Sequence, residues 1–477
     1  MKSSRFAPLA LFLIATQFAF APPAAAQTTY DLVIENGRVM DPATNLDAVR
    51  SIGISGGKIA AISTTTLKGK SRIDAKGLVV SPGFIDLHWH GIDPEYYRYP
   101  AMEGVTAALE LEIGVPDVDK WYAERAGKSM IHYGAATGHA RIRMDILHDT
   151  GDFLPANTGA NTVATPEEIS QIGMRLERDL KRGAPAVGFG IAYTPAATYA
   201  EILEMFRIAA RFDAVCHVHM RPGEPGLSEV IAAAFLTGAR LHIVHINSSA
   251  NSSIKHYLSV IEQARKRGLD VTTEAYPYDA GATRIESALF ADWKSQPDSY
   301  FQQLQWPSTG ERLTRASFEK YRKQGGILIQ HSNTEANARV AILSPLTMIA
   351  SDGFDLTKGE GHPRSSGTYA RMLGKYVREE KALSLMDALR KMTILPAERL
   401  EKRVPAMRNK GRIRVGADAD LAIFNADKII DKSDYAHPAV YAEGVVHVLV
   451  NGTAIVRDGK LVAGAHPGTA LRGPVRP

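Results

Sequence analysis

Two histidines separated by one residue, His88 and His90, end an apolar run that begins at Pro82. In an extended strand, side chains two residues apart point to the same face, so both imidazoles can reach one point in space. Imidazole nitrogens are common ligands of first-row divalent metals. The spacing therefore predicts one wall of a metal site at the end of a buried strand.

Further histidine and acidic side chains end apolar runs in the same way. They are Glu110 and Glu112 after 105–109, His219 after 214–218, His245 after 241–244 and Asp352 after 346–351. Imidazoles and carboxylates together form the ligand set of zinc, and a carboxylate beside the ion can take a proton from water. We therefore expect one or two divalent ions, with Zn²⁺ as the cofactor, and hydrolytic chemistry.

The part of the chain between these residues alternates short apolar runs with amphipathic stretches. The run 184–192 precedes a helical stretch at 199–211, and the run 214–219 precedes another at 227–237. About eight such units fit between residues 81 and 403, which predicts an α/β fold, a (β/α)8 TIM barrel whose strand ends carry the site. The segment 281–323 interrupts the alternation, and we interpret it as a lid insertion over the barrel mouth.

Both ends of the chain are rich in β-branched residues and turn signals. Two β-rich runs meet at Asn36-Gly37, which predicts a hairpin, and similar runs flank Asn451-Gly452 near the other end. Residues 27–80 and 404–477 are therefore expected to form one small β-sandwich domain beside the barrel.

The first 26 residues have the pattern of a signal peptide. Lys2 and Arg5 precede an apolar run, and Ala24-Ala25-Ala26 offers a cleavage site. With a single cysteine, Cys216, this pattern favours export to a bacterial periplasm without disulfides. The net charge of +5 falls to +3 without the leader, and no basic run or later membrane-length apolar run follows. We expect no nucleic-acid partner and no membrane partner after leader removal.

Several motifs occur in the order typical of one family. They are Gly190-Ile191-Ala192-Tyr193, His219-Met220-Arg221, Tyr276-Pro277-Tyr278, Ser351-Asp352-Gly353 and His362-Pro363-Arg364. Together with the His-Trp-His segment, they make the chain resemble the amidohydrolase superfamily, and within it the D-aminoacylases, or N-acyl-D-amino-acid deacylases. The resemblance runs from Asp31 to Gly452. It implies a metal-bearing barrel with a β-sandwich, and metal-dependent hydrolysis of small N-acylated D-amino acids.

The resemblance also implies roles for individual residues. His219 and His245 would bind the tighter metal, His88 and His90 the second, and Asp352 would be the general base. Four residues match positions that the family uses around the substrate's amide and carboxylate: Tyr193, Arg221, Tyr278 and Arg364.

The chain departs from its relatives at three places. The family usually has a cysteine ligand after the second strand, but 109–113 contains none. Glu112 is the preferred replacement because it is nearer the strand end, and Glu110, which lies on the same face, is the alternate. A bridging carboxylate would favour two metals. Asn247 stands where the family commonly has a lysine for the substrate carboxylate. No lysine in 186–191 could be carboxylated to bridge the ions.

Two other interpretations stay open at this point. The same site could serve a hydantoinase-like cyclic amidase or a D-specific dipeptidase, because barrel chemistry follows the loops. The protein could also be a non-catalytic exported protein that binds a metal or ligand, although Asp352, a residue needed for proton transfer, is present.

Overall fold

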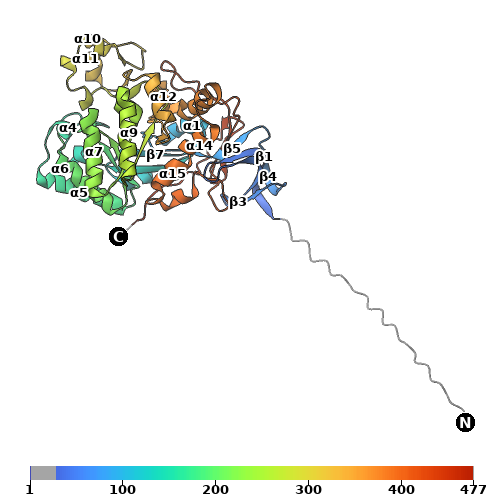
Figure 1. Ribbon diagram of the computed structural model, residues 1–477. Coiled ribbons are helices and arrows are strands. Elements are labelled where there is room, and N and C mark those ends of the chain that lie inside the picture. The colour runs from blue at the N-terminus through green and yellow to red at the C-terminus, as the bar shows by residue number, and fades with distance from the viewer. Residues whose placement is uncertain (2–27, 476–477) are drawn as a thin grey trace.

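The computed structural model describes residue 1 and residues 28–475, so the expected leader lies outside the described chain. A parallel eight-stranded sheet forms the centre, and a nine-stranded sheet built from both ends of the chain lies at its side (Figure 1). A third, three-stranded sheet belongs to the segment that follows Gly281. The predicted barrel and the small β domain are both present.

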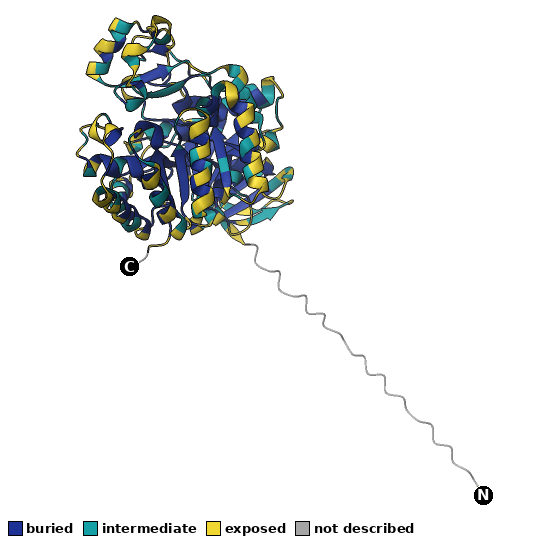
Figure 2. Cartoon of the chain, turned by 60° about the vertical axis from the view of Figure 1, so that its left-hand side comes forward, coloured by how far each residue is buried: buried dark blue, intermediate teal, exposed yellow. Residues whose placement is uncertain are grey.

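The eight strands follow one another around the barrel in sequence order. They are β6 (Phe84–Asp86), β7 (Val105–Val115), β8 (His132–Gly138), β9 (Ala186–Gly190), β10 (Val215–His219), β11 (Arg240–Ile243), β12 (Val271–Ala275) and β16 (Thr347–Ile349). Helices cover the outside, among them α5 (Pro166–Lys181), α6 (Tyr199–Arg211), α7 (Gly223–Thr237), α9 (Ile254–Lys266), α12 (Glu335–Leu343) and α14 (Leu385–Met392). The strands are buried and the outward helix faces exposed (Figure 2), as parallel sheets require.

Side chains and loop backbone, rather than a strand pair, join the first and last strands of the barrel. Ser351 donates its backbone N–H to Asp86 Oδ1 at 3.1 Å and its hydroxyl to Asp86 Oδ2 at 2.5 Å. Trp89 and Gly353 form an isolated parallel bridge, and the N–H of His90 donates to the Gly353 carbonyl at 2.7 Å. The segments after β6 and β16 therefore lie side by side.

The terminal sheet has the order β20-β19-β18-β17-β5-β1-β2-β3, with β4 paired to β1. Its strands are β1 (Thr29–Asp41), β2 (Leu46–Ser55), β3 (Lys58–Ser63), β4 (Lys68–Asp74), β5 (Val79–Pro82), β17 (Leu421–Phe424), β18 (Val445–Val450), β19 (Thr453–Arg457) and β20 (Lys460–Leu461). The hairpin predicted at Asn36-Gly37 was wrong. β1 continues through Asn36, whose φ of 64° is absorbed by a bulge because β2 pairs with β1 on both sides.

A buried charge cluster fastens this sheet to the barrel. Asp420 accepts from Lys410 Nζ at 2.7 Å, from His132 Nε2 at 3.1 Å and from the N–H of Asn451 at 2.7 Å. Burial would raise the pKa of Asp420, but Lys410 and His132 outweigh it and hold this pKa below its usual range.

Asp420→Asn is expected to lower the free energy of unfolding at pH 7 by about 2–3 kcal/mol, because it removes one of the two carboxylates that pair with buried Lys410 and leaves only Asp418, at 3.0 Å. A lowered carboxyl pKa stabilises the fold above the unfolded value near 3.9 and loses that effect as the pH falls. The gap to wild type should therefore narrow, by about 1 kcal/mol at pH 3. Urea denaturation at both pH values measures this gap. Asp47→Asn, which breaks an exposed pair with Arg38, is the control and should cost under about 1 kcal/mol.

The segment after Gly281 folds as a small unit with its own core. Its sheet contains β13 (Gly281–Arg284), β15 (Ile327–Gln330) and β14 (Leu304–Gln305), and α10 (Asp298–Phe301) and α11 (Arg315–Gln324) lie with it at the top of Figure 1. The Trp306 and Tyr321 rings stack in its core with centroids 4.2 Å apart. This cap unit, residues 281–330, contains the whole predicted insertion and extends beyond its expected end at 323.

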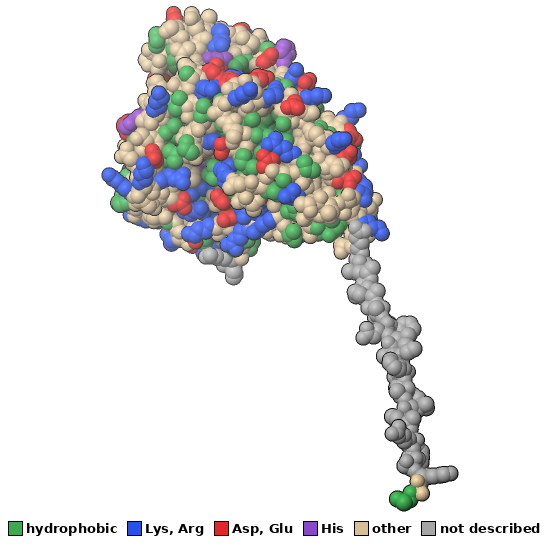
Figure 3. Space-filling view, turned by 45° about the vertical axis from the view of Figure 1, so that its right-hand side comes forward, with side chains coloured by type: hydrophobic (Ala, Val, Ile, Leu, Met, Phe, Trp, Pro, Cys, Tyr) green, Lys and Arg blue, Asp and Glu red, His purple; other side chains and the backbone are tan. Residues whose placement is uncertain are grey.

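No helix of the described chain is both long and apolar enough to cross a bilayer. On the face shown in Figure 3, lysine and arginine side chains outnumber aspartate and glutamate, and both kinds are present. The described surface on that side therefore carries charges of both signs.

Candidate metal centre

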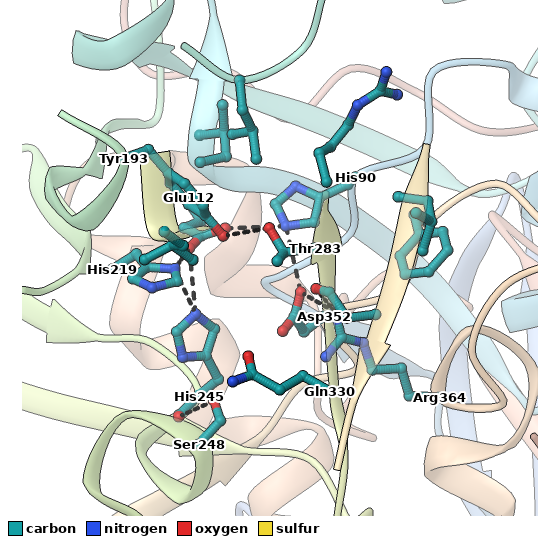
Figure 4. Close-up of a pocket in the computed structure, with 18 of the residues that line it drawn as sticks. His90, Glu112, Tyr193, His219, His245, Ser248, Thr283, Gln330, Asp352 and Arg364 are labelled. Atoms are coloured by element: carbon teal, nitrogen blue, oxygen red, sulfur yellow. Dashed lines mark hydrogen bonds and ion pairs between the residues drawn. The ribbon is translucent and has the colours of Figure 1, made fainter. Parts of the chain in front are cut away.

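A cavity of about 460 Å³ lies between the carboxyl ends of the barrel strands and the cap unit. The barrel contributes His90, Glu112, His219, His245 and Asp352, and the cap unit contributes residues of β13 and β15 (Figure 4). Strand ends that lie between residues 90 and 352 of the sequence thus meet at one opening, where a (β/α)8 barrel places its active site.

One group of donor atoms comes from the two ends of the barrel. His88, His90 and Asp352 offer ligand atoms that all lie within 4.8 Å of one another. The Nε2 atoms of His88 and His90 are 3.0 Å apart, and Asp352 Oδ1 lies 3.5 Å from the first and 3.4 Å from the second. The same-face arrangement predicted from the His-Trp-His spacing is present.

A second group contains Glu112, His219 and His245. Glu112 Oε1 is 2.7 Å from His219 Nδ1 and 3.2 Å from His245 Nε2. Its other oxygen, Oε2, lies 3.1 Å from His88 Nε2 and 3.0 Å from His90 Nε2. Glu112 therefore stands between the two groups and contacts both.

Glu110, the alternate at this strand end, has a different position. One of its oxygens lies 2.6 Å from His90 Nδ1, and the other accepts the backbone N–H groups of Ile113 and Gly114 at 3.1 Å. Glu110 contacts Nδ1 of His90, whereas Nε2 of the same ring faces His88, so Glu110 orients the ring from the side opposite the donor group.

The two groups fit divalent ions. In each, two imidazole nitrogens face one another, 3.0 Å apart for His88 and His90 and 3.1 Å for His219 and His245. Two neutral ring nitrogens without protons cannot bond to each other, whereas both can direct lone pairs at a cation. Nitrogen and carboxylate donors in this proportion suit zinc.

The carboxylates of the site are held in the charged form. Burial would raise the pKa of Glu112, but His88, His219 and His245 outweigh it and keep this pKa well below its ordinary value. Burial would also raise the pKa of Asp352, but Arg364 and His88 outweigh it and lower this pKa. An ionised Asp352 can accept a proton.

Two of the donor residues have strained backbones. His245 has φ 33° and Asp352 has φ 52°, in the left-handed region that side chains with a Cβ seldom adopt. Each lies in the loop directly after its barrel strand. Such strain gathers at functional sites, where surrounding contacts hold it.

Arg364 is a buried cation with unused donors. Its Nη2 lies 2.9 Å from Asp352 Oδ1 and 3.2 Å from the Ala282 carbonyl, and its side chain is 1% exposed. Its Nε and Nη1 have no hydrogen-bond partner among the described residues. The guanidinium also lies 4.8 Å from the centroid of the Tyr276 ring. A fixed guanidinium with two free N–H groups at a cavity wall is suited to a carboxylate.

The other predicted substrate residues divide into two sets. Tyr193 lines the cavity, with its hydroxyl 3.0 Å from Thr283 Oγ1, and burial keeps its pKa well above 10. Arg221 does not line the cavity; it bonds Glu229 at 2.9 Å and the carbonyls of Pro195 and Ala197.

Tyr278 also lies outside the lining. Its hydroxyl is 3.3 Å from Asp431 and 3.4 Å from the Pro363 carbonyl. Asn247 donates to the Tyr276 carbonyl at 3.2 Å and does not line the cavity either.

Some lining residues were not expected from the sequence. Tyr276, Ser248, Thr283 and Gln330 line the cavity. Tyr276 belongs to a motif that the sequence analysis quoted, so its place at a strand end was a usable signal. Thr283 and Gln330 come from the cap unit, and no sequence motif predicts how that unit folds.

Comparisons with known proteins agree with this geometry. The profile of the Amidohydrolase family matches residues 72–142 and 347–456. An N-acyl-D-glutamate deacylase of Alcaligenes xylosoxydans xylosoxydans is 29% identical, over 90% of this chain and 94% of its own. A D-aminoacylase of the same organism is 27% identical, over 93% and 97%.

Solved structures show the same fold. The N-acyl-D-glutamate deacylase of Bordetella bronchiseptica, complexed with zinc and a phosphonate inhibitor, has a TM-score of 0.81 at 24% identity, covering 94% of this chain and all of its own. A D-aminoacylase crystal structure has a TM-score of 0.78 at 25% identity, covering 93% of this chain and all of its own.

A (β/α)8 barrel with two histidine–carboxylate groups at its strand ends defines a metal-dependent hydrolase that acts on amide bonds. The chain is similar to the amidohydrolases, and among the relatives it matches are D-aminoacylases and N-acyl-D-glutamate deacylases.

Proposed function

We propose that the protein hydrolyses the amide bond of N-acyl-D-amino acids and releases a carboxylate and a D-amino acid. The observation that carries this proposal is the placement of Arg364 at the wall of the cavity that both donor groups line, bonded to Asp352 and with Nε and Nη1 unpaired among the described residues. The substrate's carboxylate would bind there, so its amide would lie near Asp352. The deacylase names of the similar proteins support the same reaction.

In this proposal Glu112, His219 and His245 would hold one zinc ion, and His88, His90 and Asp352 would hold the second. Glu112 contacts histidines of both groups. A bound zinc ion would polarise the amide carbonyl and lower the pKa of a water molecule. The protein's own residues orient the substrate and move the protons.

Asp352 is the proposed general base. Its carboxylate takes the proton of the attacking water and later delivers it to the leaving amine nitrogen. Arg364, 2.9 Å from Asp352 Oδ1, fixes that carboxylate while its free N–H groups bind the substrate. Tyr193, kept neutral by its raised pKa, can donate its hydroxyl hydrogen toward the developing oxyanion.

The test is a panel of N-acetyl-D- and N-acetyl-L-amino acids given to zinc-loaded protein, with release of free amine as the readout. We expect release from D-substrates only. Absence of D-specific release, or faster opening of a hydantoin ring than of any linear amide, would contradict the proposal.

Replacement of Arg364 with methionine is expected to lower kcat/KM by about 100-fold or more, mainly through KM, because a buried charge contact with substrate costs 2–5 kcal/mol when one partner is removed. The measurement is the ratio of kcat/KM for N-acetyl-D-leucine to that for its C-terminal amide. Wild type should prefer the free acid and the variant should not.

Arg221→Gln is the matched control, since its guanidinium is bonded to Glu229 and two carbonyls away from the cavity. It should leave the acid-to-amide ratio within about twofold. A lost preference in Arg221→Gln with an unchanged one in Arg364→Met would reverse the assignment.

We also propose export to the periplasm. The support is the sequence of residues 1–26 alone, with its basic start, apolar run and Ala24-Ala25-Ala26. N-terminal sequencing of protein from a fractionated bacterial host tests it: a chain that begins at Gln27 in the periplasmic fraction is expected.

A further inference from the structure

A buried carboxylate behind the metal site contacts two histidines at once. Glu274 on β12 places Oε1 at 2.5 Å from His88 Nδ1 and Oε2 at 3.0 Å from His242 Nε2. It is 1% exposed, both histidines are 0% exposed, and Glu274 does not line the cavity. This series of hydrogen bonds continues on the other side of His242, whose Nδ1 lies 2.7 Å from Thr272 Oγ1.

The donors and acceptors in this series of hydrogen bonds can be assigned one after another. An ionised carboxylate only accepts hydrogen bonds, so His88 Nδ1 and His242 Nε2 must both carry protons. Nδ1 of neutral His242 is then the acceptor for the Thr272 hydroxyl. With its proton held on Nδ1, neutral His88 has its lone pair on Nε2, the atom that faces His90 and Glu112.

We propose that Glu274 is a positioning residue for the metal site: with His242 and Thr272, it fixes the ring and the tautomer of His88 so that Nε2 can bind an ion. This inference rests on the proposed function, because it assumes that His88 is a metal ligand. Partners of this kind behind metal-binding histidines set ligand orientation and commonly account for a 10–100-fold difference in metal affinity.

His217 contributes packing only. Its ring lies 4.6 Å from that of His242, and neither of its nitrogens has a hydrogen-bond partner among the described residues. It holds the plane of His242 while the hydrogen bonds run through Glu274.

The experiment compares two Glu→Gln variants. Glu274→Gln removes the charge and turns an amide N–H₂ toward one of the two rings. Glu201→Gln is the control, because Glu201 is equally buried and accepts from a histidine, His139, at 2.8 Å and from Arg143 at 2.9 Å, but lies outside the site. Both variants should melt below wild type, so a stability change alone decides nothing.

The deciding readouts are the apparent Zn²⁺ dissociation constant, measured against a chromophoric chelator, and the visible spectrum of the Co²⁺-substituted protein. We expect Glu274→Gln to weaken Zn²⁺ binding by about 10–100-fold and to change the Co²⁺ bands, and Glu201→Gln to change neither. Folded Glu274→Gln protein with wild-type affinity, within twofold, would overturn the inference.

If Glu274→Gln does not fold, the Zn²⁺ affinity of Glu274→Asp is measured instead, because aspartate keeps the charge but is one methylene too short to reach both rings. An affinity within twofold of wild type would again overturn the inference. Wild-type protein that binds no Zn²⁺ would refute the proposed function instead. The two failures are therefore distinguishable.

Discussion

Asp352→Asn is expected to lower kcat by about 10³-fold while the zinc ion of the Glu112, His219 and His245 group stays bound, because general-base catalysis contributes about 10²–10⁴-fold and an amide cannot accept the proton. The side chain keeps its shape, and its amide oxygen can still accept from Arg364 Nη2, which lies 2.9 Å from the wild-type carboxylate. Steady-state kinetics on an N-acetyl-D-amino acid and metal content by mass spectrometry provide the measurement.

The same substitution at Asp355 is the control. Asp355 also lines the cavity, but it accepts the backbone N–H groups of Ile92 and Asp93 at 3.0 Å, and burial raises its pKa to about 6. Asp355→Asn should change kcat much less than Asp352→Asn. If Asp352→Asn bound ligand and metal normally and wild type showed no turnover to lose, the protein would be a binding protein rather than an enzyme.

Glu112→Gln is the second large effect that we expect. Its carboxylate oxygens lie 2.7–3.2 Å from nitrogens of four histidines, so a neutral amide would remove the charge shared by both groups and turn N–H bonds toward the ligand nitrogens. Zinc affinity should fall by more than about 100-fold, beyond the usual effect of a residue outside the ligand set. Zinc per chain after dialysis, and activity, measure it.

Glu110→Gln separates the two acids that the sequence could not distinguish. Among the proposed ligands Glu110 contacts only His90, at the nitrogen that faces away from the other donors, so its loss should weaken zinc binding by about 10-fold and leave two ions bound at saturating zinc. Loss of bound zinc in Glu110→Gln with normal content in Glu112→Gln would exchange their roles.

Much of this arrangement was predictable because parallel barrels place strand ends together. The strands and helices expected at 184–192, 199–211 and 214–219 correspond to β9, α6 and β10. The period of two in β7 put Glu110 and Glu112 on one face, but spacing alone could not choose between them. That choice depends on where His90 turns its two nitrogens, a tertiary property.

Other features depend on contacts that sequence spacing does not encode. Arg221 and Arg364 each lie two residues after a motif histidine. Arg221 is neutralised by Glu229, whereas Arg364 keeps N–H groups without a partner among the described residues. The Asn36-Gly37 pair has the composition of a hairpin turn, but a bulge accommodates the same positive φ within a longer strand. In both cases the local sequence pattern is present, but a contact with a neighbouring element decides which structure or role the residues adopt.

The contact between Asp86 and Ser351 joins residues 265 positions apart, and it is this contact that brings His88 and His90 beside Asp352. These donors therefore come together only after nearly the whole barrel has been made and folded, since contacts of such sequence separation form late. Recovery of zinc binding by the His88, His90 and Asp352 group during refolding would thus report completion of the ring, and a nascent chain that ends before residue 351 would lack the carboxylate of this group.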